Sequence, residues 1–128
     1  MEIPKDLKYS KEHEWIKIEG NIATLGITDF AQEQLGDVVM VELPSEGQIL
    51  VKDETCGVVE SVKSVSDIFS PVSGKVLEVN DPLVDSPGVI NEDCYGEGWI
   101  AKVELSDPKE LQGLMEPHAY EAFLSEGS

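Results

Sequence analysis

Lys63 is one of few side chains in this sequence that could carry covalent chemistry. It lies in the stretch CGVVESVKSVSDIFSPVSGKV, residues 56–76, among short valine-rich runs, with serines at positions 61, 64 and 66. Serine side chains are small, so they leave the ammonium group open to approach from solvent. The other residues with possible nucleophilic or ligand chemistry are Cys56, Cys94, His13 and His118.

The charge around Lys63 argues against a catalytic role for this lysine. An exposed lysine has a pKa of about 10.4 and is a weak nucleophile unless burial or a nearby cation lowers that value. Glu60, Asp67 and a net charge of −17 would instead hold the proton on the amine. A lysine that only keeps a strand edge soluble would not need this surrounding sequence. The pattern therefore predicts that another enzyme modifies Lys63.

The cysteines and histidines show no arrangement typical of catalysis or metal binding. Cys56 and Cys94 are 38 positions apart, which is not a metal-ligand spacing, and a disulfide between them would need an oxidising compartment. We interpret both as free thiols that pack in the interior. His13 and His118 have no visible nucleophile or metal partner, and we interpret them as surface or packing residues. The sequence predicts no catalytic residue and no metal site.

Composition excludes several classes of partner. Twenty-six acidic residues against nine basic ones would repel the phosphates of nucleic acids. No apolar run approaches the roughly 20 residues that span a bilayer, and the opening MEIPKDLKYSKEHEW lacks the pattern of a signal or transit peptide. We expect a cytoplasmic monomer with one domain over residues 1–128. The acidic surface could attract basic protein patches or only keep copies apart.

The elements that must position Lys63 are short strands. Runs rich in β-branched residues and bounded by Gly, Pro or Asp predict a mainly β fold, a sandwich or small barrel. Gly20 and Asn21 predict the turn of the first hairpin. Lys63 then lies at the tip of a later hairpin. The expected strands are residues 14–19, 22–28, 36–44, 47–52, 57–61, 66–71, 74–81 and 98–105.

Two helical segments are expected. A short helix follows the first hairpin, with Thr28 as N-cap and Gly36 as its end. A helical tail over about 107–125 begins with Asp107 as cap and Pro108 in the first turn, and Glu110 would complete a capping box. We expect the tail to cover an open end of the β core.

The stretch around Lys63 resembles a known family. VESVKSVSDIFSPVSG is similar to the lipoylation hairpin of the H protein of the glycine cleavage system. The segments YSKEHEW, GITDFAQEQLGDVVMVELP and NEDCYGEGWIAKVELSD resemble the same family in the same order, so the resemblance covers nearly the whole chain. It implies a flattened hybrid barrel or sandwich of the lipoyl and biotinyl type.

The resemblance also implies a function, that of a non-catalytic carrier with lipoate on Lys63. Such a carrier takes an aminomethyl group from a pyridoxal-phosphate glycine decarboxylase to an aminomethyltransferase that uses tetrahydrofolate. A flavin-dependent dihydrolipoamide dehydrogenase reoxidises its dithiol, and a lipoate ligase or lipoyltransferase attaches the cofactor. By residue matching, Glu60 and Gly74 correspond to positions read during lipoylation, although Gly74 could also form a turn. The cleft where the loaded arm rests would include Glu14, Ile27 and Asp67.

Related carriers remain as alternatives. Biotin carriers usually place methionines on both sides of the lysine, where this chain has Val62 and Ser64. Lipoyl domains of 2-oxo acid dehydrogenase complexes usually have Asp before the lysine and lack both the HEW segment and the helical tail. A lipoyl donor that relays the cofactor to other complexes would use the same lysine.

Overall fold

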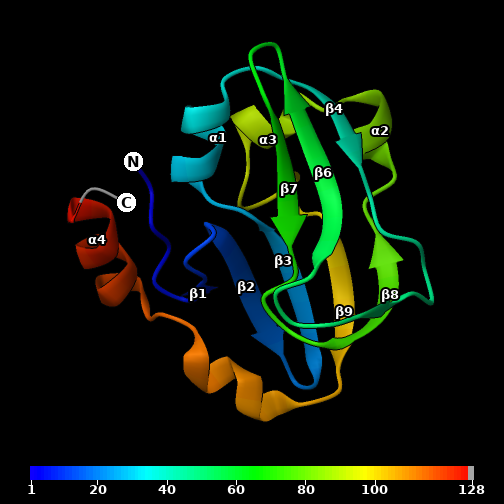
Figure 1. The fold of residues 1–128 in the computed structure, drawn as a ribbon, viewed down its shortest axis with the longest axis vertical. Helices are drawn as coiled ribbons and strands as arrows, with labels where there is room; N and C mark the ends of the chain where they lie inside the picture. Colours follow the sequence, from blue (N-terminus) through cyan, green and yellow to red (C-terminus); the bar gives the residue numbers. More distant parts are fainter. Residues whose placement is uncertain (127–128) are drawn as a thin grey trace.

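The strands form two antiparallel sheets in the computed structural model, which describes residues 1–126 (Figure 1). The larger sheet has the order β1-β2-β3-β9-β8-β5, and the smaller has the order β4-β6-β7. The predicted mainly β fold is confirmed as a flattened sandwich, and the sheets do not close into a barrel. The larger sheet comprises β1 (Lys8–Tyr9), β2 (Glu14–Glu19), β3 (Ile22–Ile27), β5 (Ile49–Leu50), β8 (Gly74–Val79) and β9 (Ala101–Leu105). The smaller comprises β4 (Val38–Glu42), β6 (Thr55–Ser61) and β7 (Val65–Phe69).

The main hydrophobic core lies between the two sheets. Both sheets contribute to it through every second residue of a strand, as expected where one face of each strand is buried. Burial of these aliphatic side chains is the main stabilising contribution to the fold. The core includes Leu25 and Ile27 of β3, Val41 of β4, Val59 of β6, Ile68 of β7, Val76 of β8 and Val103 of β9.

The first hairpin and the helix after it form as the sequence predicts. β2 pairs with β3 from Glu14 opposite Ile27 to Glu19 opposite Ile22. Helix α1 (Asp29–Leu35) then begins after Thr28, whose Oγ1 accepts a hydrogen bond of 3.3 Å from the N–H of Ala31. Two short helices, α2 (Pro82–Asp85) and α3 (Val89–Glu92), were not predicted; each buries one residue in the core, Leu83 and Ile90.

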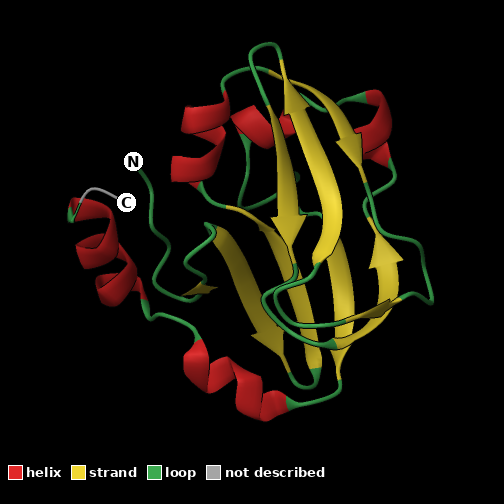
Figure 2. Cartoon of the chain, viewed as in Figure 1, coloured by secondary structure: helices red, strands yellow, loops and turns green. Residues whose placement is uncertain are grey.

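The C-terminal tail is helical, and it packs along the larger sheet (Figure 2). The 3-10 helix η1 (Pro108–Gly113) begins at Asp107, whose side chain accepts a hydrogen bond from the N–H of Lys109. The predicted capping box is wrong, because the Glu110 carboxylate accepts hydrogen bonds from Ser73 instead. The final helix, α4 (Pro117–Ser125), stacks Tyr120 on Tyr9 of β1 with ring centroids 4.6 Å apart.

Only part of the tail covers an end of the β core, as the sequence predicts for the whole tail. Leu111 and Leu114, in and just after η1, pack against a second buried cluster at the end of the sheet where β2 and β3 turn (Figure 1). Helix α4 lies beside the β1 edge instead. None of the helices within residues 1–126 is long and apolar enough to cross a membrane.

Candidate functional site

Lys63 is exposed at the tip of the β6–β7 hairpin, as predicted. The turn is held by buried Ser61, whose N–H donates to the carbonyl of Ser64 over 2.8 Å. The Ser61 hydroxyl oxygen accepts from the backbone N–H groups of Lys63 and Ser64, at 3.3 and 3.1 Å. Local side-chain to backbone bonds of this kind fix a turn without a glycine. The lysine therefore has an ordered base and an exposed side chain.

The tip is also attached to the connection between α1 and β4. The N–H of Val62 donates to the carbonyl of Asp37 over 3.1 Å. Gly36 has a φ of 80° and lies under the Lys63 side chain, so that a Cβ added to Gly36 would be 3.2 Å from Lys63 Cε. Gly36 was predicted only as the end of α1. The structure shows that its missing side chain also leaves room for the lysine.

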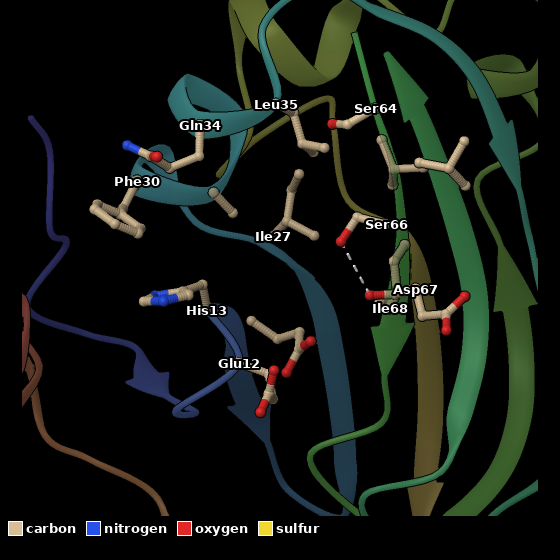
Figure 3. Close-up of a pocket in the computed structure, with 14 residues that line it drawn as sticks. Glu12, His13, Ile27, Phe30, Gln34, Leu35, Ser64, Ser66, Asp67 and Ile68 are labelled. Carbon is tan, nitrogen blue, oxygen red and sulfur yellow. Dashed lines mark hydrogen bonds between the residues drawn. The ribbon is translucent and has the colours of Figure 1, made fainter. Parts of the chain in front are cut away.

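A cleft of about 330 Å³ lies beside the tip, between α1, β2, β3 and β7 (Figure 3). Half of its fourteen lining residues are apolar, and these give an aliphatic chain a surface to pack on. The three residues predicted for an arm-resting cleft, Glu14, Ile27 and Asp67, all line it. The other lining residues are Glu12, His13, Phe30, Ala31, Gln34, Leu35, Val59, Ser64, Val65, Ser66 and Ile68.

Glu14 is the buried carboxyl group of this cleft, with 2% of its surface exposed. Its Oε1 accepts a 2.5 Å hydrogen bond from Ser10 Oγ, and its Oε2 accepts one of 3.2 Å from the N–H of Phe69. Burial disfavours the charged form and raises the pKa of Glu14 to about 7, although these two hydrogen bonds act in the opposite direction. The Glu12 and Asp53 carboxylates raise it further. Glu14 can therefore gain or lose a proton near neutral pH.

Asp67 lines the cleft, but its carboxyl group points away from Ile27 and His13 (Figure 3). The strand register explains this direction. Asp67 is opposite Val58, whereas Ser66 is opposite core residue Val59, so Ser66 and Asp67 face opposite sides of the sheet. The sequence match identified Asp67 without revealing that the side chain directed toward the cleft belongs to Ser66.

His13, which the sequence indicates to be a surface or packing residue, lines the cleft. Its ring packs on Phe30 with centroids 4.5 Å apart, and its Nδ1 is 2.9 Å from the Tyr120 hydroxyl. That hydroxyl is also 2.7 Å from Thr28 Oγ1. Burial lowers the pKa of His13, while the Glu12 carboxylate raises it. The packing interpretation is confirmed, and the contact also connects α4 to the wall of the cleft.

The two predicted recognition residues lie in different surroundings. Glu60 is half-buried on β6, close to Lys63 in sequence and in space. Gly74 is buried at the start of β8, at the end of the sandwich opposite the β6–β7 tip (Figure 1). A Cβ on Gly74 would collide with the carbonyl oxygen of Glu104 and with Val103. Gly74 therefore lies in a strand, and the alternative that it forms a turn is wrong. Recognition of Gly74 by the lipoylating enzyme stays a prediction.

Neither cysteine shows features of a reactive thiol. Cys56 and Cys94 are buried and free, and burial raises the pKa of each thiol to about 12. Their predicted role as packing residues is confirmed. Among residues 1–126, no group of three or more His, Cys, Asp or Glu side chains could hold a metal ion.

An exposed lysine on an ordered hairpin tip, in a flattened β-sandwich with a partly apolar cleft beside it, is the arrangement of a carrier protein of the lipoyl and biotinyl type. Comparison with known proteins identifies the family. The sequence matches the glycine cleavage H-protein family over residues 7–127, and the chain belongs to this family. Members of this family are non-catalytic lipoyl carriers.

Individual relatives agree with this assignment along nearly the whole chain. The chain is 63% identical over 125 residues to the glycine cleavage system H protein of Symbiobacterium thermophilum, covering 98% of each sequence. It is 60% identical over 126 residues to that of an Anaeromyxobacter strain, again with 98% of each covered. The crystal structure of a glycine cleavage system H protein from Mycobacterium marinum is similar with a TM-score of 0.89 and 40% identity, covering 96% of this chain and 99% of that one.

Proposed function

We propose that Lys63 carries lipoate in amide linkage and that the protein moves an aminomethyl group from glycine decarboxylase to the aminomethyltransferase. Its dithiol would then be reoxidised by dihydrolipoamide dehydrogenase. The observation that carries this proposal is the exposed Lys63 side chain on a turn fixed by Ser61. The chain would act as one domain and as a monomer in the cytoplasm, and a lipoate ligase or lipoyltransferase would attach the cofactor.

The residues around Lys63 fit such a group. Acylation removes the lysine charge and adds an aliphatic chain, and the neighbouring cleft offers Ile27, Leu35 and Ile68 as apolar contacts. The base of the arm is held by backbone hydrogen bonds, while the end of the side chain is free to reach solvent. A tethered group is presented to each partner at high effective concentration, provided that its base is exposed enough to enter the partner's site. The hairpin tip meets that condition.

The proposal is tested by incubating the purified protein with lipoate, ATP and a lipoate ligase. Intact-mass spectrometry should show the gain of one lipoyl group, and peptide mapping should place it on Lys63. The modified protein should then support glycine-dependent aminomethyl transfer when the decarboxylase and aminomethyltransferase are added. Modification at another lysine, or a lipoylated protein that supports no transfer, would contradict the proposal.

The cleft makes a further prediction about the loaded carrier. The amine of the carried group can be cationic, and Glu14 is the buried carboxyl group lining the cleft that could accept a hydrogen bond from it. A charge-assisted hydrogen bond contributes about 1–3 kcal/mol, so Glu14→Gln should speed spontaneous loss of the aminomethyl group by roughly tenfold. Time-resolved mass spectrometry of the loaded proteins measures this rate.

Asp67→Asn is the matched control, because the Asp67 carboxyl group points away from the cleft. This variant should lose the group at the wild-type rate, and Glu14→Gln should be lipoylated normally. Equal decay of wild type and Glu14→Gln would show that the cleft carboxyl group does not protect the load. Faster decay of Asp67→Asn alone would mean that the arm rests on the other face of β7.

A further inference from the structure

Exposed apolar side chains gather around Lys63. Val62 and Val65, on either side of the tip, are 71% and 65% exposed. On the neighbouring strand β4, Val39 and Met40 are 49% and 47% exposed. Exposed apolar residues that adjoin one another mark an interaction site, whereas single ones scattered over a surface do not.

Strand pairing places several of these residues in one row. Met40 of β4 is opposite Glu60 of β6, and Glu60 is opposite Val65 of β7. Residues directly opposite each other in antiparallel strands point to the same face, so this row lies on the outer face of the smaller sheet. Val62 extends it at the tip. We call Met40, Glu60, Val62 and Val65 the tip face.

The surface next to the tip face is acidic. The next row on the same side of the sheet is formed by Glu42, Val58 and Asp67. Strands β4, β6 and β7 contain no basic residue, so the Lys63 ammonium is the local positive charge of this surface. A complementary partner therefore has an apolar centre with lysine or arginine side chains around it.

We infer that the tip face is the docking site of the enzyme that acylates Lys63, and that Met40 on β4 is part of the recognised surface. This inference rests on the proposed function. An unmodified lysine is short, so an enzyme that acylates it must approach the hairpin tip closely. Partners that meet the finished arm can act at a greater distance. The acylating enzyme is therefore the partner that needs the apolar residues around the tip.

The position of β4 relative to the tip is fixed, which makes a strand distant in sequence part of the same surface. The Val62 N–H bond to the Asp37 carbonyl joins the tip to the residue before β4. Gly36 brings the same connection under the Lys63 side chain. An enzyme that grips Lys63 from the outer side of the sheet therefore contacts Met40 as well as the residues of the hairpin itself.

The test compares the initial rates at which a lipoate ligase modifies two matched variants in the presence of lipoate and ATP. Intact-mass spectrometry follows the rates. Met40→Thr removes an exposed apolar side chain from β4, and Leu77→Thr removes one of 41% exposure from β8 in the other sheet. Threonine suits a strand, so both variants should keep the fold. Met40→Thr should lower kcat/KM by about five- to twentyfold through a higher KM, and Leu77→Thr should stay within about twofold of wild type.

A second variant keeps the inference testable if Met40→Thr alters the fold. Val65→Thr keeps the branched shape of the side chain but replaces one methyl group by a hydroxyl, and it should raise KM by about threefold. Added salt should raise KM for the wild type, because charge attraction between exposed groups is screened. If wild type is lipoylated on Lys63 and Met40→Thr and Val65→Thr both keep the wild-type KM, the docking inference is overturned. The proposed function would still stand. A wild type that is not lipoylated on Lys63 would overturn the proposed function itself.

Discussion

Lys63→Arg is expected to give a folded protein that accepts no lipoate and transfers no aminomethyl group. Arginine keeps the positive charge at the hairpin tip, but its guanidinium group does not form the amide that a lysine amine forms. The side chain is exposed and the turn is held by the backbone and by Ser61, so stability should change by less than about 0.5 kcal/mol. Intact mass, thermal unfolding and glycine-dependent transfer measure the three properties.

Lys75→Arg is the control for this substitution, because Lys75 is also exposed and lies in a strand, β8, away from the tip. It should be lipoylated and active at the wild-type level. Residual aminomethyl transfer by Lys63→Arg would sink the assignment of Lys63 as the carrier residue. A Lys63→Arg protein that does not fold would instead show that the lysine is needed for the structure.

The second large effect concerns the stability of the protein at different pH values. Burial raises the pKa of Glu14 to about 7 from its ordinary value of 4.5. Between these values the folded protein holds a proton that the unfolded chain releases, so the unfolded state binds fewer protons. The free energy of unfolding therefore falls as pH rises through this window. The contribution is complete below about pH 4.5 and is lost as pH passes about 7.

Glu14→Gln should remove this dependence. The amide oxygen can accept the hydrogen bond from the Phe69 N–H, and the amide nitrogen can donate to Ser10 Oγ, so both partners of the carboxyl group are retained. The variant should be more stable than wild type by about 2–3 kcal/mol at pH 8 and nearly equal to it at pH 4.5. Urea unfolding at the two pH values gives the free energies.

The difference between the two proteins isolates Glu14 from the rest of the charge. Repulsion among the other carboxylates also lowers stability as pH rises, but it is common to wild type and variant. Glu33→Gln is a control, because Glu33 is exposed and is not among the carboxylates that raise the pKa of Glu14, and it should leave the pH profile close to that of wild type. Parallel profiles for wild type and Glu14→Gln would show that Glu14 is ionised in the folded protein across this range.

Local features of the fold could be read from short stretches of sequence. The β2–β3 hairpin, helix α1 between Thr28 and Gly36, and the placement of Lys63 at a hairpin tip all formed as predicted. Each depends on neighbouring residues, because turns, caps and strand alternation are set within a few positions of the chain. The short helices α2 and α3 were missed, since segments of four residues carry too little periodicity to be recognised.

The family resemblance identified the residues of the cleft but not their behaviour. Glu14, Ile27 and Asp67 do line one cleft, although they come from three different strands. Only the register of β6 and β7 shows that Asp67 turns its carboxyl group outward while Ser66 takes the inner face. A shift of one residue would reverse the two, and register is a property of paired strands rather than of either strand alone.

Other features of the site depend on contacts between residues far apart in sequence. The pKa of Glu14 is set by burial and by the N–H of Phe69, 55 positions away. Gly36 gives space to Lys63, and Met40 joins the tip face through its pairing with Glu60. The residue types around Lys63 specify a modifiable lysine on a turn. The burial, register and packing of distant strands decide which side chains surround it, because they arise only when the two sheets come together.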